Sequence, residues 1–124
     1  MIHHVHLACP PHSEQALRFF CVILLAMVEL PKPLALAARG GCWFRHLKGW
    51  ELHFGVEEDF RPQRKAHPGI LCDELETLAK RLEGAGYPVI WDEELPGFGR
   101  FYSEDPNGNR LEFLTPARQV APSP

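Results

Sequence analysis

Two histidines and two glutamates recur at nearly the same interval along this chain. His4 and His67 are separated by 63 positions, and Glu51 and Glu112 by 61. Each histidine lies in a short apolar segment, HHVHLAC or AHPGILC, and each glutamate in a strand-like segment, WELHF or RLEFL. Imidazole nitrogens and carboxylate oxygens are common ligands of divalent transition metals. A duplicated unit that supplies both pairs therefore predicts a metal site, provided that the four side chains converge.

The composition is that of one globular domain. The chain has 124 residues, of which 45% are hydrophobic, so it can bury a core. Its formal charge of −3 gives no electrostatic reason to expect nucleic acid or an anionic membrane as a partner. The longest apolar segment, residues 19–28, is too short to cross a bilayer and lacks the layout of a signal peptide. We expect a cytoplasmic protein that binds a small-molecule substrate.

The four cysteines do not indicate a metal or disulfide framework. They form no CxxC pair, and each lies in apolar surroundings: Cys9, Cys21, Cys42 and Cys72. Buried reduced thiols are the simpler expectation.

The first half of the chain predicts one strand, one helix and three further strands. Residues 2–9 alternate as a strand does, and two prolines end it. Ser13 is placed to cap a helix whose later part, CVILLAMV, is apolar on all sides and should pack on two sides. Turns at Gly40-Gly41 and Lys48-Gly49 separate three strands, which we expect at 34–38, 42–46 and 50–56.

The same order then restarts after a polar connector, residues 57–65. A strand at 67–72 precedes a helix that Asp73 and Glu76 would begin as a capping box. Three strands follow, with Asn107-Gly108 as the last turn, at 88–92, 99–104 and 109–115. The tail, 117–124, has no apolar pattern and should be loose.

This order predicts an α+β fold built from two tandem βαβββ modules. They would span about residues 1–56 and 66–116 of a single domain, 1–124, and curl a mixed sheet around a central cavity. Because alternate side chains of a strand share a face, His4 and His6 should lie opposite the apolar residues of their strand, and so should Glu51 with His53. Glu112 has the same relation to its neighbours.

Inward-pointing carboxylates on core strands need a reason. Burying a carboxylate costs several kcal/mol unless it is paired or bound to a metal, which favours a ligand role for Glu112 and, less strongly, for Glu51. His6 is interpreted as a cavity-lining residue. Arg100 and Tyr102 are two positions apart and share a face. They would bind substrate if that face is the cavity, whereas a core tyrosine beside a rim arginine explains them equally well.

The segment FYSEDPNGNRLEFL, residues 101–114, resembles the closing hairpin of the vicinal oxygen chelate superfamily. This superfamily includes glyoxalases, fosfomycin-resistance and bleomycin-resistance proteins, and extradiol dioxygenases. The opening HHVHLAC and the restart AHPGILC are similar to the first strands of its paired modules, so the resemblance covers about residues 2–116. The first helix departs from the family pattern, since it lacks the usual polar residue and glycine at its end.

The resemblance implies a ligand set and a chemistry. His4, Glu51, His67 and Glu112 would hold Zn, Ni, Co, Mn or Fe, and Glu51 or Glu112 would be the catalytic base. His53 would replace Glu51 as a ligand or bind it through a hydrogen bond. His6, His53, Arg100 and Tyr102 would then contact the substrate. A homodimer is also implied, with each cavity closed within one chain or between two.

The function that the resemblance implies first is a metal-dependent, glyoxalase-like lyase or isomerase of a small oxygen-chelating substrate. Two alternatives stay open. One is a thiol transferase or dioxygenase of the same superfamily. The other is a metal-independent drug-binding or resistance protein, for which Trp43, Phe44, Trp50 and Trp91 would supply an aromatic groove.

Overall fold

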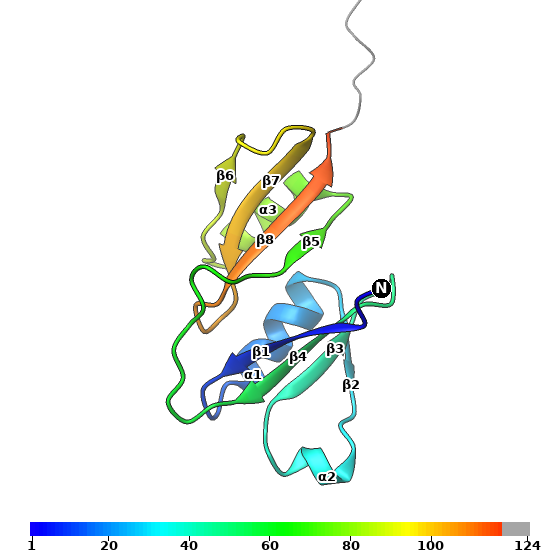
Figure 1. The fold of residues 1–124 in the computed structure, drawn as a ribbon, viewed down its shortest axis with the longest axis vertical. Helices are drawn as coiled ribbons and strands as arrows, with labels where there is room; N and C mark the ends of the chain where they lie inside the picture. The colour runs from blue at the N-terminus through cyan, green and yellow to red at the C-terminus, as the bar shows by residue number, and fades with distance from the viewer. Residues whose placement is uncertain (118–124) are drawn as a thin grey trace, which may run out of the picture.

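The computed structural model describes residues 1–117 and contains two four-stranded mixed sheets (Figure 1). In the first sheet the strand order is β1-β4-β3-β2, with β1 parallel to β4 and the other pairs antiparallel. The elements of this first module are β1 (His4–Cys9), α1 (Glu14–Arg18), the π-helix η1 (Phe19–Leu24), β2 (Val28–Leu30), α2 (Leu34–Ala37), β3 (Cys42–Arg45) and β4 (Glu51–Val56).

The second module repeats this topology. Its strand order is β5-β8-β7-β6, again with the first strand parallel to the last and the other pairs antiparallel. Its elements are β5 (Gly69–Leu71), α3 (Leu75–Gly84), β6 (Ile90–Asp92), β7 (Phe98–Glu104) and β8 (Arg110–Pro116). The predicted α+β fold of two βαβββ modules is therefore confirmed.

One face of each sheet is covered by helix, and the other is not. Figure 1 shows α1 and α3 behind their sheets, where α1 contacts β3 and α3 contacts β7 and β8. Large apolar side chains fill the space between helix and sheet, among them Phe20, Phe44, Phe54, Phe101 and Phe113. The uncovered faces are turned toward the viewer in Figure 1.

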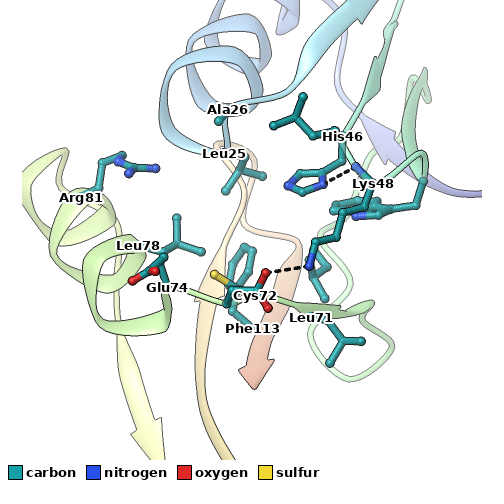
Figure 2. A pocket seen from close by; sticks show the side chains of 14 residues that line it. Leu25, Ala26, His46, Lys48, Leu71, Cys72, Glu74, Leu78, Arg81 and Phe113 are labelled. Atoms are coloured by element: carbon teal, nitrogen blue, oxygen red, sulfur yellow. Dashed lines mark hydrogen bonds and ion pairs between the residues drawn. The ribbon is translucent and has the colours of Figure 1, made fainter. Parts of the chain in front are cut away.

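Polar contacts join the two modules. The Asn109 side-chain amide donates to the carbonyl oxygen of Ala8 (2.9 Å) and to the Asp105 carboxylate (2.8 Å). On the helix side, Lys48 and Asp73 form an ion pair of 2.7 Å across a cavity of about 320 Å³ (Figure 2). Leu25, Leu78 and Phe113 line this cavity, which lies between the modules.

The strand predicted at residues 34–38 is wrong. The structure has a short helix there, α2, and the strand that pairs with β3 is β2, which begins at Val28 opposite Arg45. Leucine and alanine are good helix formers, and Pro33 sets the extended conformation that precedes the first helical turn. A run of apolar residues this short fits a helical turn as well as it fits a strand.

The two predicted helix caps also differ from the structure. Ser13 stands at the first helix start, but its hydroxyl donates back to the carbonyl oxygen of Pro10 (2.9 Å) instead of accepting from the helix. Helix α3 begins after Glu74, and the Asp73 carboxylate is paired with Lys48. The predicted capping box is therefore wrong, because an ion pair between modules takes the carboxylate.

The end of the first helix explains its departure from the family pattern. The backbone N–H of Leu25 donates to the carbonyl of Phe20 (3.0 Å), and that of Met27 donates to Cys21 (2.9 Å). Ala26 closes this end with φ of 56°, the left-handed conformation that glycine usually supplies. Phe19 and Ile23 are at least half exposed, so the single chain packs this helix on one side only.

All four cysteines are free, as predicted; Cys9, Cys21 and Cys42 are buried, whereas Cys72 is only partly buried. Burial raises the pKa of Cys42 to about 12, so its thiol is not reactive near neutral pH. Among residues 1–117, no helix is long and apolar enough to cross a membrane. The tail predicted to be loose, 117–124, lies outside the described residues except for Ala117, whose N–H donates to Gly97.

Candidate metal site

The first half-site, defined as His4, His6, Glu51 and His53, lies on the uncovered face of the first sheet. Parallel pairing of β1 with β4 places His4 beside Glu51 and His6 beside His53. Their strand neighbours Leu7, Leu52 and Phe54 point to the helix side and are buried. The alternation that the sequence predicted thus brings these four side chains together.

Glu51 is buried, with 4% of its surface exposed, and both carboxylate oxygens are engaged. His53 Nε2 lies 2.8 Å from Oε1, while Arg45 donates to Oε2 from Nε (3.0 Å) and Nη2 (2.9 Å). The hydrogen bond from His53, followed by the contacts with Arg45, lowers the pKa of Glu51. The carboxylate is therefore ionised at neutral pH.

His53 is held as the middle ring of a stack. The His4 ring lies parallel to it at 4.0 Å, and the Trp43 ring at 4.2 Å on the other side. Burial lowers the pKa of His53, so the ring is neutral and its Nε2–H donates to Glu51. His6 lies over Gly55, where a side chain would collide with its ring. The stack fixes His53 as a hydrogen-bond donor to Glu51.

The second half-site, defined as His67, Arg100, Tyr102 and Glu112, lies on the uncovered face of the second sheet. Glu112 pairs with Tyr102 on β7 and with Gly69 on β5, two residues after His67. Leu111 and Phe113, on either side of Glu112, point into the core. Glu112 itself is 8% exposed.

His67 has both ring nitrogens directed at oxygens. Nδ1 lies 2.7 Å from the carbonyl oxygen of Lys65, and Nε2 lies 2.9 Å from Glu112 Oε1. A carbonyl only accepts, so Nδ1 carries the proton. Nε2 then faces a carboxylate, which is favourable only with a second proton or a bound cation between the two atoms. Metal-binding histidines commonly have this arrangement, with one nitrogen fixed by an oxygen acceptor.

Arg100 holds the other oxygen of Glu112. Its Nη1 donates to Oε2 (3.2 Å), while Nε and Nη2 donate to Asp92 Oδ1 (3.1 and 3.0 Å). The predicted substrate-binding arginine is thus bonded to two carboxylates. Tyr102 lies edge-on to His67, with ring centroids 5.5 Å apart.

Neither half-site is complete by itself. Within residues 1–117, no group of three or more His, Cys, Asp or Glu side chains is arranged to hold a metal ion. A cavity of about 350 Å³ at the junction of β1 and β5 is lined by His4, Glu51 and Gly69. The donor types fit a divalent transition metal. His4, Glu51, His67 and Glu112 are the side chains that would hold it, and one chain keeps them as two pairs.

Sequence reasoning missed Arg45 and Asp92. The predicted turn at Lys48-Gly49 pairs residues symmetrically across the hairpin, and that symmetry places Arg45 opposite Glu51. Asp92 likewise lies opposite Arg100 in the β6–β7 pair. Oppositely charged residues at cross-strand positions attract each other, so both contacts could have been predicted from the hairpin register.

Comparison with solved structures finds close similarity over almost the whole chain. A glyoxalase family protein from Bacillus anthracis is 39% identical, with a TM-score of 0.89, and the match covers 94% of this chain and 95% of that one. A glyoxalase/dioxygenase from Nostoc punctiforme is 18% identical, with a TM-score of 0.75 and coverage of 94% and 91%. A lactoylglutathione lyase from Agrobacterium tumefaciens is 16% identical, with a TM-score of 0.70 and coverage of 93% and 92%.

The last two similarities concern the fold alone. No protein-family model matches the sequence, and no curated protein matches it. The paired βαβββ modules and the similarity to the Bacillus anthracis protein define a protein of the vicinal oxygen chelate superfamily. Within it, this chain belongs to the glyoxalase family.

Proposed function

We propose that this protein is a divalent-metal-dependent lyase or isomerase that acts on a small substrate with two adjacent oxygens. The observation that carries this proposal is the geometry of His67. Its Nδ1 proton is used by Lys65, and its Nε2 is directed at the Glu112 carboxylate. A divalent metal held by His67 and Glu112 would satisfy both groups without a second proton on the ring.

We further propose that the complete site forms between two chains. Each chain supplies two half-sites on the uncovered faces of its sheets, and each half-site contains two of the four ligands. In a dimer with twofold symmetry, the first half-site of one chain faces the second half-site of the other, and two complete sites result. His4 and Glu51 of one chain would then join His67 and Glu112 of the second.

The bound metal would act as a Lewis acid that stabilises negative charge on the substrate oxygens. Arg45 holds Oε2 of Glu51, and Arg100 holds Oε2 of Glu112. The Oε1 atom of Glu51 faces His53, and that of Glu112 faces His67. The lowered pKa of Glu51 makes it a weak proton acceptor. We therefore assign proton transfer to the Glu112 carboxylate and a holding role to Glu51.

Metal analysis tests this proposal. Wild-type protein purified without chelator should carry about one metal ion per chain, as expected for one complete site per protomer. His67→Ala and Glu112→Ala should be empty, while Arg61→Gln, an exposed change in the connector, should be loaded like wild type. The loaded wild type should isomerise a hemithioacetal. Metal-free wild type that no divalent metal reconstitutes would contradict the proposal.

A second candidate function is metal-independent binding of a cationic aromatic molecule. A hollow of about 790 Å³ beside β6 is lined by Trp91, Phe98 and several carboxylates, among them Glu74, Glu76 and Glu93. Trp91 is half exposed, and an aromatic face with nearby carboxylates suits an organic cation. Titration of an acridinium dye in EDTA would separate the candidates: saturable binding lost in Trp91→Ala favours this second function.

A further inference from the structure

We propose that Arg110 binds an anionic group of the substrate, so that the natural substrate is a small organic acid, a carboxylate or a phosphonate, with an apolar part. This inference rests on the proposed function and specifies the substrate class of the same site. It concerns a residue that neither the metal ligands nor their supporting contacts use.

Arg110 is placed beside the second half-site. It lies on β8, two residues before Glu112, and therefore on the same face of the sheet. Its guanidinium carbon lies 3.9 Å from the centroid of the Tyr102 ring. The same Tyr102 ring packs edge-on against His67, with ring centroids 5.5 Å apart. An anion on Arg110 would therefore lie next to the metal-binding pair.

Within residues 1–117, the Arg110 guanidinium has no carboxylate partner, unlike the arginines that hold the two candidate glutamates. Arg45 is paired with Glu51, and Arg100 with both Asp92 and Glu112. No carboxylate of residues 1–117 lies within ion-pair distance of Arg110. Its side-chain hydrogen bond to the carbonyl oxygen of Arg64 is long, 3.4 Å. Most of its N–H donors are thus free to bind an anion.

The Tyr102 ring orients the Arg110 guanidinium before an anion binds. A guanidinium stacked on an aromatic ring is attracted to the ring face and keeps its N–H groups in the plane, directed outward. In that orientation the fork of two N–H groups matches the two oxygens of a carboxylate or phosphonate. Arg100 lies 5.1 Å from the centroid of the same ring, but its own N–H groups are taken by Asp92 and Glu112.

The surrounding cavity fits an acid with an apolar part. It measures about 230 Å³, and its lining includes Arg64, Pro88, Ile90, Tyr102, Glu104 and Arg110. Two arginines against one glutamate leave this lining positively charged at neutral pH. Ile90 is exposed by 62% and, with Pro88, forms an apolar wall beside the charged end. The shape and charge favour a small aliphatic or aromatic acid over a neutral ligand.

Matched probe ligands test this assignment. Benzoate and phenylphosphonate carry the anion in its two forms, and benzamide is a neutral analogue of benzoate. Calorimetric titrations would use wild type, Arg110→Gln and the control Arg61→Gln, each as purified and again with EDTA. We expect wild type to bind at least one of the two anions roughly tenfold more tightly than benzamide, a difference of about 1.4 kcal/mol. Arg61→Gln should keep this preference, and Arg110→Gln should lose it.

The titrations with EDTA separate this inference from the metal proposal. A preference for anions that persists without metal and disappears in Arg110→Gln supports the inference even if the protein never binds a metal. Equal binding of benzoate and benzamide, no binding of either anion, or an unchanged preference in Arg110→Gln would overturn it. Dissociation of a dimer by Arg110→Gln, with the preference intact, would also overturn it and assign Arg110 to a contact between chains.

Discussion

The two half-sites have the same topology, but they differ in how the histidine is positioned relative to the glutamate. In the second, His67 reaches Glu112 from the connection just before β5, and its Nδ1 is fixed by the Lys65 carbonyl. In the first, Glu51 is bonded to His53 from its own strand, while His4 stacks on that ring and contacts His3. The two modules thus give similar frames, and in the second the histidine lies within hydrogen-bond distance of its glutamate.

The arginines that hold the two glutamates also differ, and the arginine of the second half-site is the more buried one. The Arg100 side chain is 15% exposed and is held on its other side by Asp92. The Arg45 side chain is 53% exposed and contacts Glu51 alone among the carboxylates of the described residues. Solvent screens the ion pair of a buried arginine less than that of an exposed one. We therefore expect changes in the second half-site to have the larger effects.

The largest predicted difference is between the two glutamates. Glu112→Gln should lower turnover at least about 100-fold, because an amide cannot accept the substrate proton that we assign to Glu112. Glu51→Gln should lower it by less than about tenfold, since the amide oxygen can still hold the metal. Turnover of metal-saturated protein measures both. Equal losses would remove the distinction between the half-sites.

The second predicted difference is between the two arginines. Arg100→Gln should weaken metal affinity about tenfold, as is typical when a contact that orients a ligand is lost. Arg45→Gln should change the affinity about threefold or less, because the exposed pair is screened by solvent. Competition with a chromogenic chelator gives both dissociation constants. A larger loss of affinity for Arg45→Gln would mean that Arg45 contributes more to metal binding than Arg100 does.

The smallest predicted difference concerns how acid affects each module. In the first module, the backbone N–H of Gly41 donates to Glu14 (2.8 Å) and lowers the pKa of Glu14 below its usual value near 4.5. In the second, burial raises the pKa of Asp105. The contribution of Glu14 is therefore complete above pH 4.5 and is lost as the pH falls through its lowered pKa. That of Asp105 is lost as the pH rises through its raised pKa.

Glu14→Gln isolates the first of these contributions. At pH 7 the variant should be about 1 kcal/mol less stable than wild type, the difference between a charged and a neutral hydrogen-bond acceptor. As the pH falls through the lowered pKa of Glu14, the two proteins should converge, because wild-type Glu14 becomes protonated. Urea unfolding across this range measures the difference. A gap that stays constant with pH would show that Glu14 acts through packing instead.

The sequence predicted the frame of the site well, because period and alternation are local properties. The repeat of His4 and Glu51 as His67 and Glu112 identified two equivalent modules, and the alternation around Glu112 identified the uncovered face. Turn residues at Lys48-Gly49 and Asn107-Gly108 located hairpins that the structure contains.

What the sequence did not predict depends on contacts between distant residues. Asp73 is bonded to Lys48 of the other module, so a local capping pattern was misleading. Ala26 takes a left-handed conformation because the helix end needs it, although alanine has no intrinsic preference for it. Arg100 binds Asp92 and Glu112, whereas Arg110 has no carboxylate partner among the described residues. This difference depends on side-chain conformation, which the alternation of residues along a strand does not predict.

The central claim is that one metal site takes its ligands from two chains, and complementation tests it most directly. Glu51→Ala removes a ligand from the first half-site, and Glu112→Ala removes one from the second. Each variant alone should be metal-free. Unfolding the two together and refolding them should restore roughly a quarter of the wild-type metal content, since half of the dimers are mixed and each has one intact site. No restored metal in mixed dimers of confirmed composition would contradict a site shared between chains.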